Sequence, residues 1–250
     1  MMFLTEMSLF ELVKKQYKFK LHAYIRVFSA LMAIQLIAIL ISMSGVASSS
    51  TGTEGIQLNI TYYSADMVIV LTMVWAFLSS MLITTRAYRF DDFIFVATRL
   101  SSNLANALFL LTTSIVGGVT AMLSGYLLKV VIFLVKGTHL VQGDSIFHAP
   151  QEWLLGIFAS ILYTFFFSAL GYLFGMLTQI YKPLIVLLPV AFWGISFIHS
   201  MGGEEPIIEL FYQFFFNEVS SWIFFVKMLI SSVFLLSCSA AISNRMGVRN

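Results

Sequence analysis

Long apolar stretches recur along the whole chain and are separated by short polar segments. Six of them approach or exceed roughly 20 residues, the length of helix that crosses the hydrocarbon core of a bilayer. Only 10% of the 250 residues are charged, whereas a soluble domain normally carries about 25%. The sequence therefore predicts an all-α, polytopic membrane protein that forms a single transmembrane domain over residues 1–250. The six expected spans are residues 27–46, 65–84, 107–128 (or 107–135), 153–177, 183–198 and 221–242.

Lysine and arginine residues lie mainly on one side of these expected spans. Cytoplasmic loops of membrane proteins are enriched in these two residues, so their placement predicts the orientation. With the N-terminus in the cytoplasm, eleven of the fourteen fall on the cytoplasmic side, and Lys129, Lys136 and Lys227 lie near outer span ends. We therefore expect a multi-pass protein of the plasma membrane with both termini in the cytoplasm.

The first 25 residues predict an amphipathic helix in the membrane interface. Phe10 and Tyr17 belong to an apolar stripe at helical spacing, and Lys14, Lys15 and Lys18 fall largely on the opposite side. A basic amphipathic helix before a span is expected to place its lysines near anionic headgroups. A solvated leader helix without a membrane role is the alternative. A signal peptide is less consistent with this segment, because its charged section is long and contains acidic residues.

Motifs for catalysis and for nucleotide binding are absent from the sequence. It lacks the phosphate-binding pattern Gly-x-x-x-x-Gly-Lys-Ser/Thr and the nucleophile pattern Gly-x-Ser-x-Gly. His139 and His148 share an expected outer loop with Asp144, which leaves a weak metal site as a minor alternative. The spans hold almost no ionisable residue near their centres, which argues against a proton-coupled carrier. We expect no catalytic residue, no bound cofactor and no metal in this chain.

Small residues in two expected spans predict close helix packing. Gly171 and Gly175 form a small-xxx-small pair, and Gly117 and Gly118 flatten one side of the third span. A moving helix interface is the alternative interpretation of the same residues. Pro189, inside the fifth span, is expected to kink that helix or to free a carbonyl group.

Two connections between spans have unusual compositions. Residues 85–106, on the expected cytoplasmic side, mix aromatic side chains with charges of both signs, which favours contact with another protein. Residues 200–220 contain an apolar run too short to span, which predicts an outer re-entrant or interfacial helix. A peripheral aromatic anchor is the alternative for this second segment. The candidate residues are Arg89, Phe90, Asp91, Asp92, Phe93 and Arg99 in the first connection, and Glu204, Glu205, Phe211 and Phe214 in the second.

The combined pattern resembles the permease subunits of type-2 ABC exporters. That family shares an N-terminal connecting helix, six spans, a coupling helix in the first cytoplasmic loop and short re-entrant outer helices. In many relatives the coupling loop reads approximately Pro-Val/Leu-Ser-Arg, followed after several residues by Lys. Here Thr98-Arg99 keeps only the end of that pattern, and Asn103 and Asn106 stand where a basic residue is common. The matching stretches are residues 4–21, 89–103 and 204–216.

In its small size and its lack of a large outer domain, the chain is most similar to Gram-positive exporters of peptides, toxins or lantibiotics. The resemblance implies a non-enzymatic permease that exports an amphipathic substrate (a peptide, toxin, antimicrobial or lipid-like molecule) from a bacterial cell. ATP and Mg would be bound by a separate ABC ATPase docked on the coupling loop. A second permease, identical or related, would face spans one and five. Membrane lipid and the substrate are the other implied partners, and no nucleic acid is expected. A non-transporting sensor or assembly partner and an ion-coupled secondary carrier are the competing classes.

Overall fold

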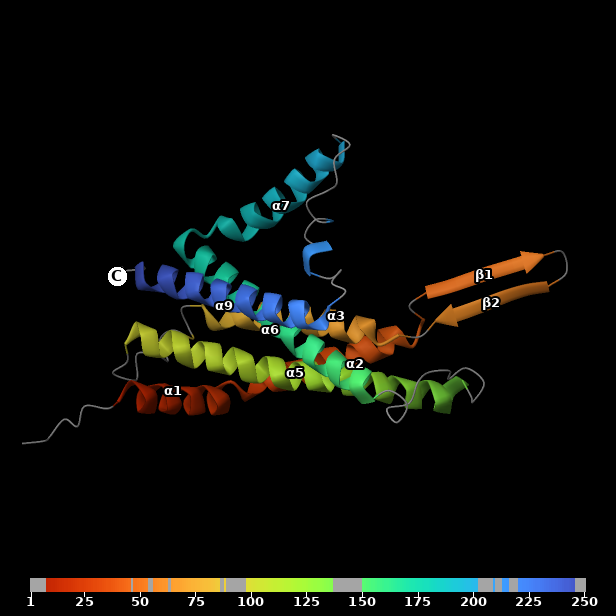
Figure 1. The fold of residues 1–250 in the computed structure, drawn as a ribbon, viewed down its shortest axis with the longest axis horizontal. Helices are drawn as coiled ribbons and strands as arrows, with labels where there is room; N and C mark the ends of the chain where they lie inside the picture. Colours follow the sequence, from red (N-terminus) through yellow and green to blue (C-terminus); the bar gives the residue numbers. More distant parts are fainter. Residues whose placement is uncertain are drawn as a thin grey trace, which may run out of the picture.

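The chain forms a bundle of long helices with a β-hairpin at one end (Figure 1). Among the residues that the structure describes, five helices are long and apolar enough to cross a membrane: α2, α3, α5, α6 and α9. The protein is therefore a polytopic, mainly helical membrane protein. In chain order the elements are α1 (Leu9–Ala23), α2 (Ile25–Ser42), β1 (Ala47–Thr53), β2 (Ile56–Tyr62), α3 (Asp66–Ile83), α5 (Arg99–Lys136), α6 (Pro150–Ile180), α7 (Leu184–Met201) and α9 (Ser221–Arg245).

These elements come from a computed structural model, which describes most but not all of the chain. The described residues are 8–45, 47–53, 56–62, 64–85, 88, 98–136, 150–201, 209, 213–215 and 220–245.

Helix α5 begins eight residues before the third span expected from the sequence. Thr98 caps it, because its hydroxyl accepts a hydrogen bond from the Ser101 amide at 3.3 Å. The last part of the expected loop 85–106 is therefore helical, and Arg99 to Asn103 belong to the helix instead of preceding it. At 1.5 Å per residue, the 38 residues of α5 extend about 57 Å, roughly twice the hydrocarbon thickness of a bilayer.

The polar segment after α2 is a β-hairpin, which corrects the expectation of an all-α chain at this place. Strands β1 and β2 pair antiparallel, from Ala47 opposite Tyr62 to Thr53 opposite Ile56. Their Ser, Thr and Gly content resembles a loop, but β2 alternates apolar and polar residues with the period of a strand. The hairpin extends from the bundle beyond the ends of α2 and α3 (Figure 1).

Helix α6 is the centre of the bundle and packs against α3, α5 and α9. Gly171 and Gly175 permit its contact with α3: a Cβ at Gly171 would collide with the Phe77 carbonyl, and one at Gly175 with Thr84. On the α5 side, a Cβ at Gly118 would lie 2.7 Å from the backbone nitrogen of Ile161. Close helix packing, as expected from the small residues, is therefore what these glycines provide.

A buried glutamine joins three helices inside the apolar bundle. The Gln35 amide of α2 donates to Thr72 Oγ1 of α3 at 3.2 Å and to Thr120 Oγ1 of α5 at 3.0 Å. It also reaches the Gly117 carbonyl at 3.4 Å. These bonds fix the relative register of α2, α3 and α5, because a buried amide without partners is costly in hydrocarbon.

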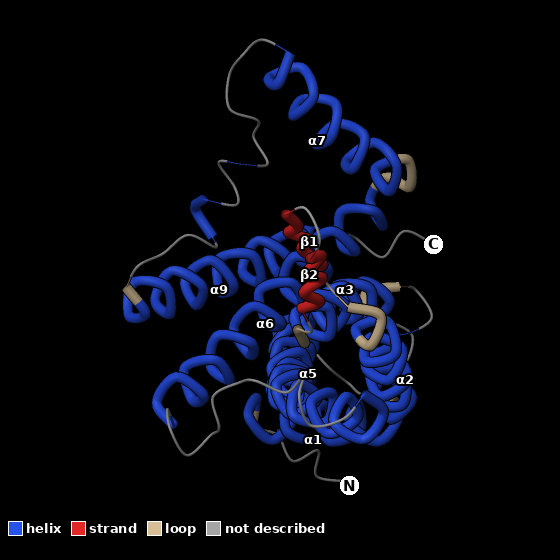
Figure 2. Tube along the Cα trace, turned by 90° about the vertical axis from the view of Figure 1, so that its right-hand side faces the viewer, coloured by secondary structure: helices blue, strands red, loops and turns tan. Residues whose placement is uncertain are grey.

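Helix α7 stands away from the other helices in both views (Figures 1 and 2). It follows α6 after a short turn and carries exposed apolar side chains, among them Val186, Leu187 and Val190. Pro189 lies inside this helix. Because α7 stands apart, its apolar side chains are left exposed.

Candidate functional site at the N-terminal end of the bundle

The candidate docking site lies at the end of the bundle where α1 begins. Helix α3 ends there, α5 starts there, and α9 also ends there (Figure 1). The connection from α3 to α5 therefore leaves and re-enters the bundle at this end. Arg99 is the first residue of α5, whereas the other expected docking residues lie outside the described part of the chain: Arg89, Phe90, Asp91, Asp92 and Phe93.

Both ends of this connection contact helices other than α3 and α5. The Tyr88 ring packs edge-on against Tyr24, at the junction of α1 and α2, with 4.8 Å between centroids. Arg99 Nη1 donates to the Ser243 carbonyl in the last turn of α9 at 3.2 Å. A guanidinium is favourable at this position, because helix C-termini carry partial negative charge. The connection is thus attached to α1, α2 and α9 as well as to its own helices.

Helix α1 runs beside the start of α5 in both views of the bundle (Figures 1 and 2). Ser8 caps its start by accepting from the Glu11 amide at 3.4 Å. Lys14, Lys15 and Lys18 are exposed, as the amphipathic pattern predicts.

The face of α1 that is buried differs from the predicted apolar stripe. Phe10 is 75% exposed, whereas Gln16 and Lys20 are fully buried beside Val13. Tyr17 is partly buried, and its hydroxyl lies 2.8 Å from Thr112 Oγ1 of α5. The packed face is more polar than expected: α5 supplies hydrogen-bond partners for Lys20 and Tyr17, whereas the buried Gln16 amide has none among the described residues.

A buried polar network ties α1 to α5 and α6. Lys20, which is 1% exposed, donates from Nζ to Asn106 Oδ1. Asn106 Nδ2 donates to the Tyr172 hydroxyl at 3.0 Å, and that hydroxyl donates to Asn103 Oδ1 at 3.1 Å. We call these four residues the Lys20 network. A buried ammonium needs such partners, so the network holds α1 in one position against the bundle.

The sequence contains a signal for this network that the apolar pattern obscured. Lys20 follows Gln16 by four residues and Val13 by seven, which places all three on one helix face. Asn103 and Asn106 are three residues apart and share a face of α5 in the same way. What the spacing alone could not show is that these two faces meet.

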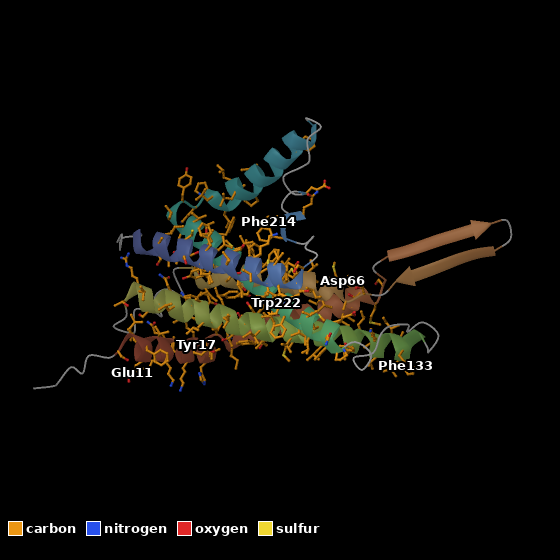
Figure 3. The ribbon with its side chains drawn as sticks, in the orientation of Figure 1. Glu11, Tyr17, Asp66, Phe133, Phe214 and Trp222 are labelled. Carbon is orange, nitrogen blue, oxygen red and sulfur yellow. The ribbon has the colours of Figure 1, made fainter. Side chains whose placement is uncertain are left out.

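The second expected segment, between α7 and α9, is described only in part. Glu204, Glu205 and Phe211 lie outside the described residues, whereas Phe214 belongs to a short helical stretch at residues 213–215. Lys227 Nζ of α9 lies 3.7 Å from the centroid of the Phe214 ring (Figure 3). The Tyr163 hydroxyl of α6 donates to the Phe215 carbonyl at 3.1 Å. This stretch therefore packs on α6 and α9.

Metal-binding chemistry has no support among the described residues, where no three His, Cys, Asp or Glu side chains gather into a possible metal site. His139, Asp144 and His148 belong to the undescribed segment between α5 and α6.

The N-terminal end of the bundle thus combines contacts between helices with exposed positive charges. These charges are the lysines Lys14, Lys15 and Lys18 of α1 and Arg99 of α5.

The chain matches no protein-family model, no curated protein and no solved structure.

Proposed function

We propose that this chain is the transmembrane permease subunit of an ATP-driven exporter, with a separate ABC ATPase docked on the connection between α3 and α5. The observation that carries the proposal is the attachment of this connection at both ends. Tyr88 contacts the α1–α2 junction, and Arg99 contacts the end of α9. A protein that displaced this connection would act on several helices at once, as a coupling element must.

The proposed topology has six spans, with α7 as the fifth. Helix α7 has 18 residues, which is near the minimum length for crossing a bilayer. The lysine and arginine distribution supports cytoplasmic termini. The plasma membrane of a bacterial cell is proposed from the resemblance to Gram-positive exporters. The N-terminal end of the bundle is then the cytoplasmic end, where a soluble ATPase would have access to the connection.

A second permease, identical or related, is the proposed partner within the membrane. Apolar side chains are exposed on α2, including Met32, Leu36 and Leu40, and on α7, including Val186 and Val190. Lipid could cover either surface, but α7 stands apart from its own bundle, which favours a protein partner. The proposed pair places α2 and α7 toward the other copy.

The proposed substrate is amphipathic: a peptide, toxin, antimicrobial or lipid-like molecule. The near absence of ionisable residues at the centres of the spans supports a substrate that needs no charged pathway. ATP and Mg belong to the partner ATPase in this proposal, and the permease itself holds no cofactor and performs no chemistry.

Co-purification with the ABC ATPase of the same source tests the docking. The double variant Asp91→Lys, Asp92→Lys reverses the acidic charge of the connection, and we expect it to lose the ATPase while still inserting into the membrane. Glu152→Lys is the control, because Glu152 is exposed at the start of α6, at the opposite end of the bundle. Undiminished ATPase binding by the double variant would refute the docking site.

Failure of the wild-type chain to bind any ATPase would favour the sensor or assembly partner. Substrate movement that stops when the proton gradient collapses, and continues without ATP, would favour the ion-coupled carrier.

A further inference from the structure

An apolar groove lies between α6 and α9, at the end of the bundle opposite the Lys20 network. Its volume is about 290 Å³, and it runs along α6 from Leu155 to Tyr163 beside the first two turns of α9. That volume is near the lower limit of small-molecule sites, which range over about 300–1,000 Å³. The groove is therefore large enough for one slender apolar ligand.

Small residues and tight helix packing together create the groove. Gly156 and Ala159 line it from α6, and Ser221 lines it from α9. A Cβ at Gly156 would lie 2.8 Å from Met122 Cε of α5, so α6 is already in close contact on its other side. Helix α6 is thus packed against α5 on one side and borders the groove on the other.

Aromatic side chains form part of the groove wall. Tyr163 and Phe224 both line the groove, and the centroids of their rings lie 5.0 Å apart. The Tyr163 hydroxyl already donates to the Phe215 carbonyl, so it does not require a polar ligand. The walls thus favour an aliphatic ligand over a polar one.

The surroundings of the groove place it in the membrane. Phe158, Ile223 and Val226 are each more than half exposed beside it, and hydrocarbon is a favourable environment for such an apolar surface in a membrane protein. Trp222, in the first turn of α9, is 79% exposed (Figure 3), and tryptophan is enriched at the membrane–water boundary. The groove therefore starts near the headgroups and continues into the adjacent acyl region.

We propose that this groove binds one acyl chain of a phospholipid from the leaflet next to Trp222. Lipid tails are as apolar as the groove, so the hydrophobic effect does not drive binding from the bilayer. Binding comes from filling a space whose walls would otherwise lack contact partners on one side. The bound chain contacts Tyr163 and Phe224 and thereby supports residues 213–215. The site requires neither an ATPase nor a transported substrate, so it goes beyond the proposed function.

Photo-crosslinking of the full-length protein tests the site. The protein is reconstituted without an ATPase in vesicles of phosphatidylcholine and phosphatidylglycerol, with a small fraction of phosphatidylcholine that carries a diazirine on one acyl chain. Label is then located by peptide mass spectrometry. We expect residues 155–163 and 221–225 to be labelled more strongly than the exposed α3 surface around Val74, which the proposed pair leaves open to lipid.

Two substitutions fill the groove from opposite walls: Ala159→Leu and Ser221→Leu. Each should reduce labelling of the groove to the level found on α3. Ala241→Leu is the matched control, because Ala241 is exposed at the opposite end of α9, away from the groove. Should Ala159→Leu fail to fold, Ser221→Leu at the start of α9 tests the same prediction.

Several outcomes would overturn the proposal. Wild-type labelling of the groove equal to that of the exposed α3 surface would mean that lipid is only a solvent there. If labelling survives in both groove-filling variants, the labelled acyl chain binds at a place other than the groove. Displacement of the label by an added amphipathic peptide would assign the groove to a substrate, and a cross-link to a second copy through residues 221–225 would assign it to an interface.

Discussion

Removal of Asn106 should destabilise the protein more than removal of the lysine that it binds. Lys20 is 1% exposed and donates to Asn106, so Asn106→Ala leaves a buried ammonium without this acceptor. A hydrogen bond to a charged group contributes about 1.5–3 kcal/mol, and the bond that Asn106 donates to the Tyr172 hydroxyl contributes about 0.5–1.5 kcal/mol more. We therefore expect Asn106→Ala to lower the free energy of unfolding by about 2–4 kcal/mol.

Lys20→Met should cost less, because it removes the charge and keeps most of the apolar stem. It leaves the Asn106 oxygen without its donor, a loss of about 1–2 kcal/mol for a neutral group. In the double variant Lys20→Met, Asn106→Ala, no ammonium is left to lose its acceptor. Its cost should be smaller than the sum of the two single costs by at least about 1 kcal/mol.

Unfolding in mixed micelles with increasing denaturing detergent measures the free energies of the wild type, the two single variants and the double variant. Lys18→Met is the control, since Lys18 is an exposed lysine two residues away, and its effect should stay within about 0.5 kcal/mol. Equal costs for the two single variants, or costs that simply add, would refute the idea that the network compensates a buried charge.

Two further predictions concern the helix contacts inside the bundle. Gly171→Leu should abolish folding, because its side chain would enter the space of the Phe77 carbonyl. Gly194→Ala should be tolerated, because no atom lies near the position of the added Cβ. Size-exclusion profiles of the two purified variants distinguish these outcomes. Gln35→Leu should lower the free energy of unfolding by about 0.6–1.7 kcal/mol, the range for hydrogen bonds between membrane helices. Thr72→Val should lower it by less, and the same detergent titration measures both effects.

The membrane-crossing helices could be predicted from the sequence because each is a long apolar run. The start of α5 could not, since Ser101, Ser102 and Asn103 are typical of helix caps and loops. In the fold, Ser101 is fully buried and Asn103 accepts a hydrogen bond from Tyr172 of α6. Contacts with α6 thus outweigh the local preference.

The candidate site was predictable only where local pattern determines it. The exposed lysines of α1 follow from helical spacing, whereas the burial of Lys20 depends on Asn106, 86 positions later in the chain. The attachment of Tyr88 to Tyr24 is likewise a contact between distant segments. A single sequence carries no direct information on such pairs, so this part of the site required the fold.

The length of α5 has a mechanical consequence. It is one helix from Arg99 to Lys136, so displacement at one end is transmitted to the other without an intervening loop. A tilt of about 10° about its midpoint would move each end of a 57 Å helix by about 5 Å, close to one helical turn. A small rotation driven at Arg99 would therefore change the contacts of α5 with its neighbours, most of all toward the two ends of α5. Helix α5 can thus act as a rigid lever across the bilayer.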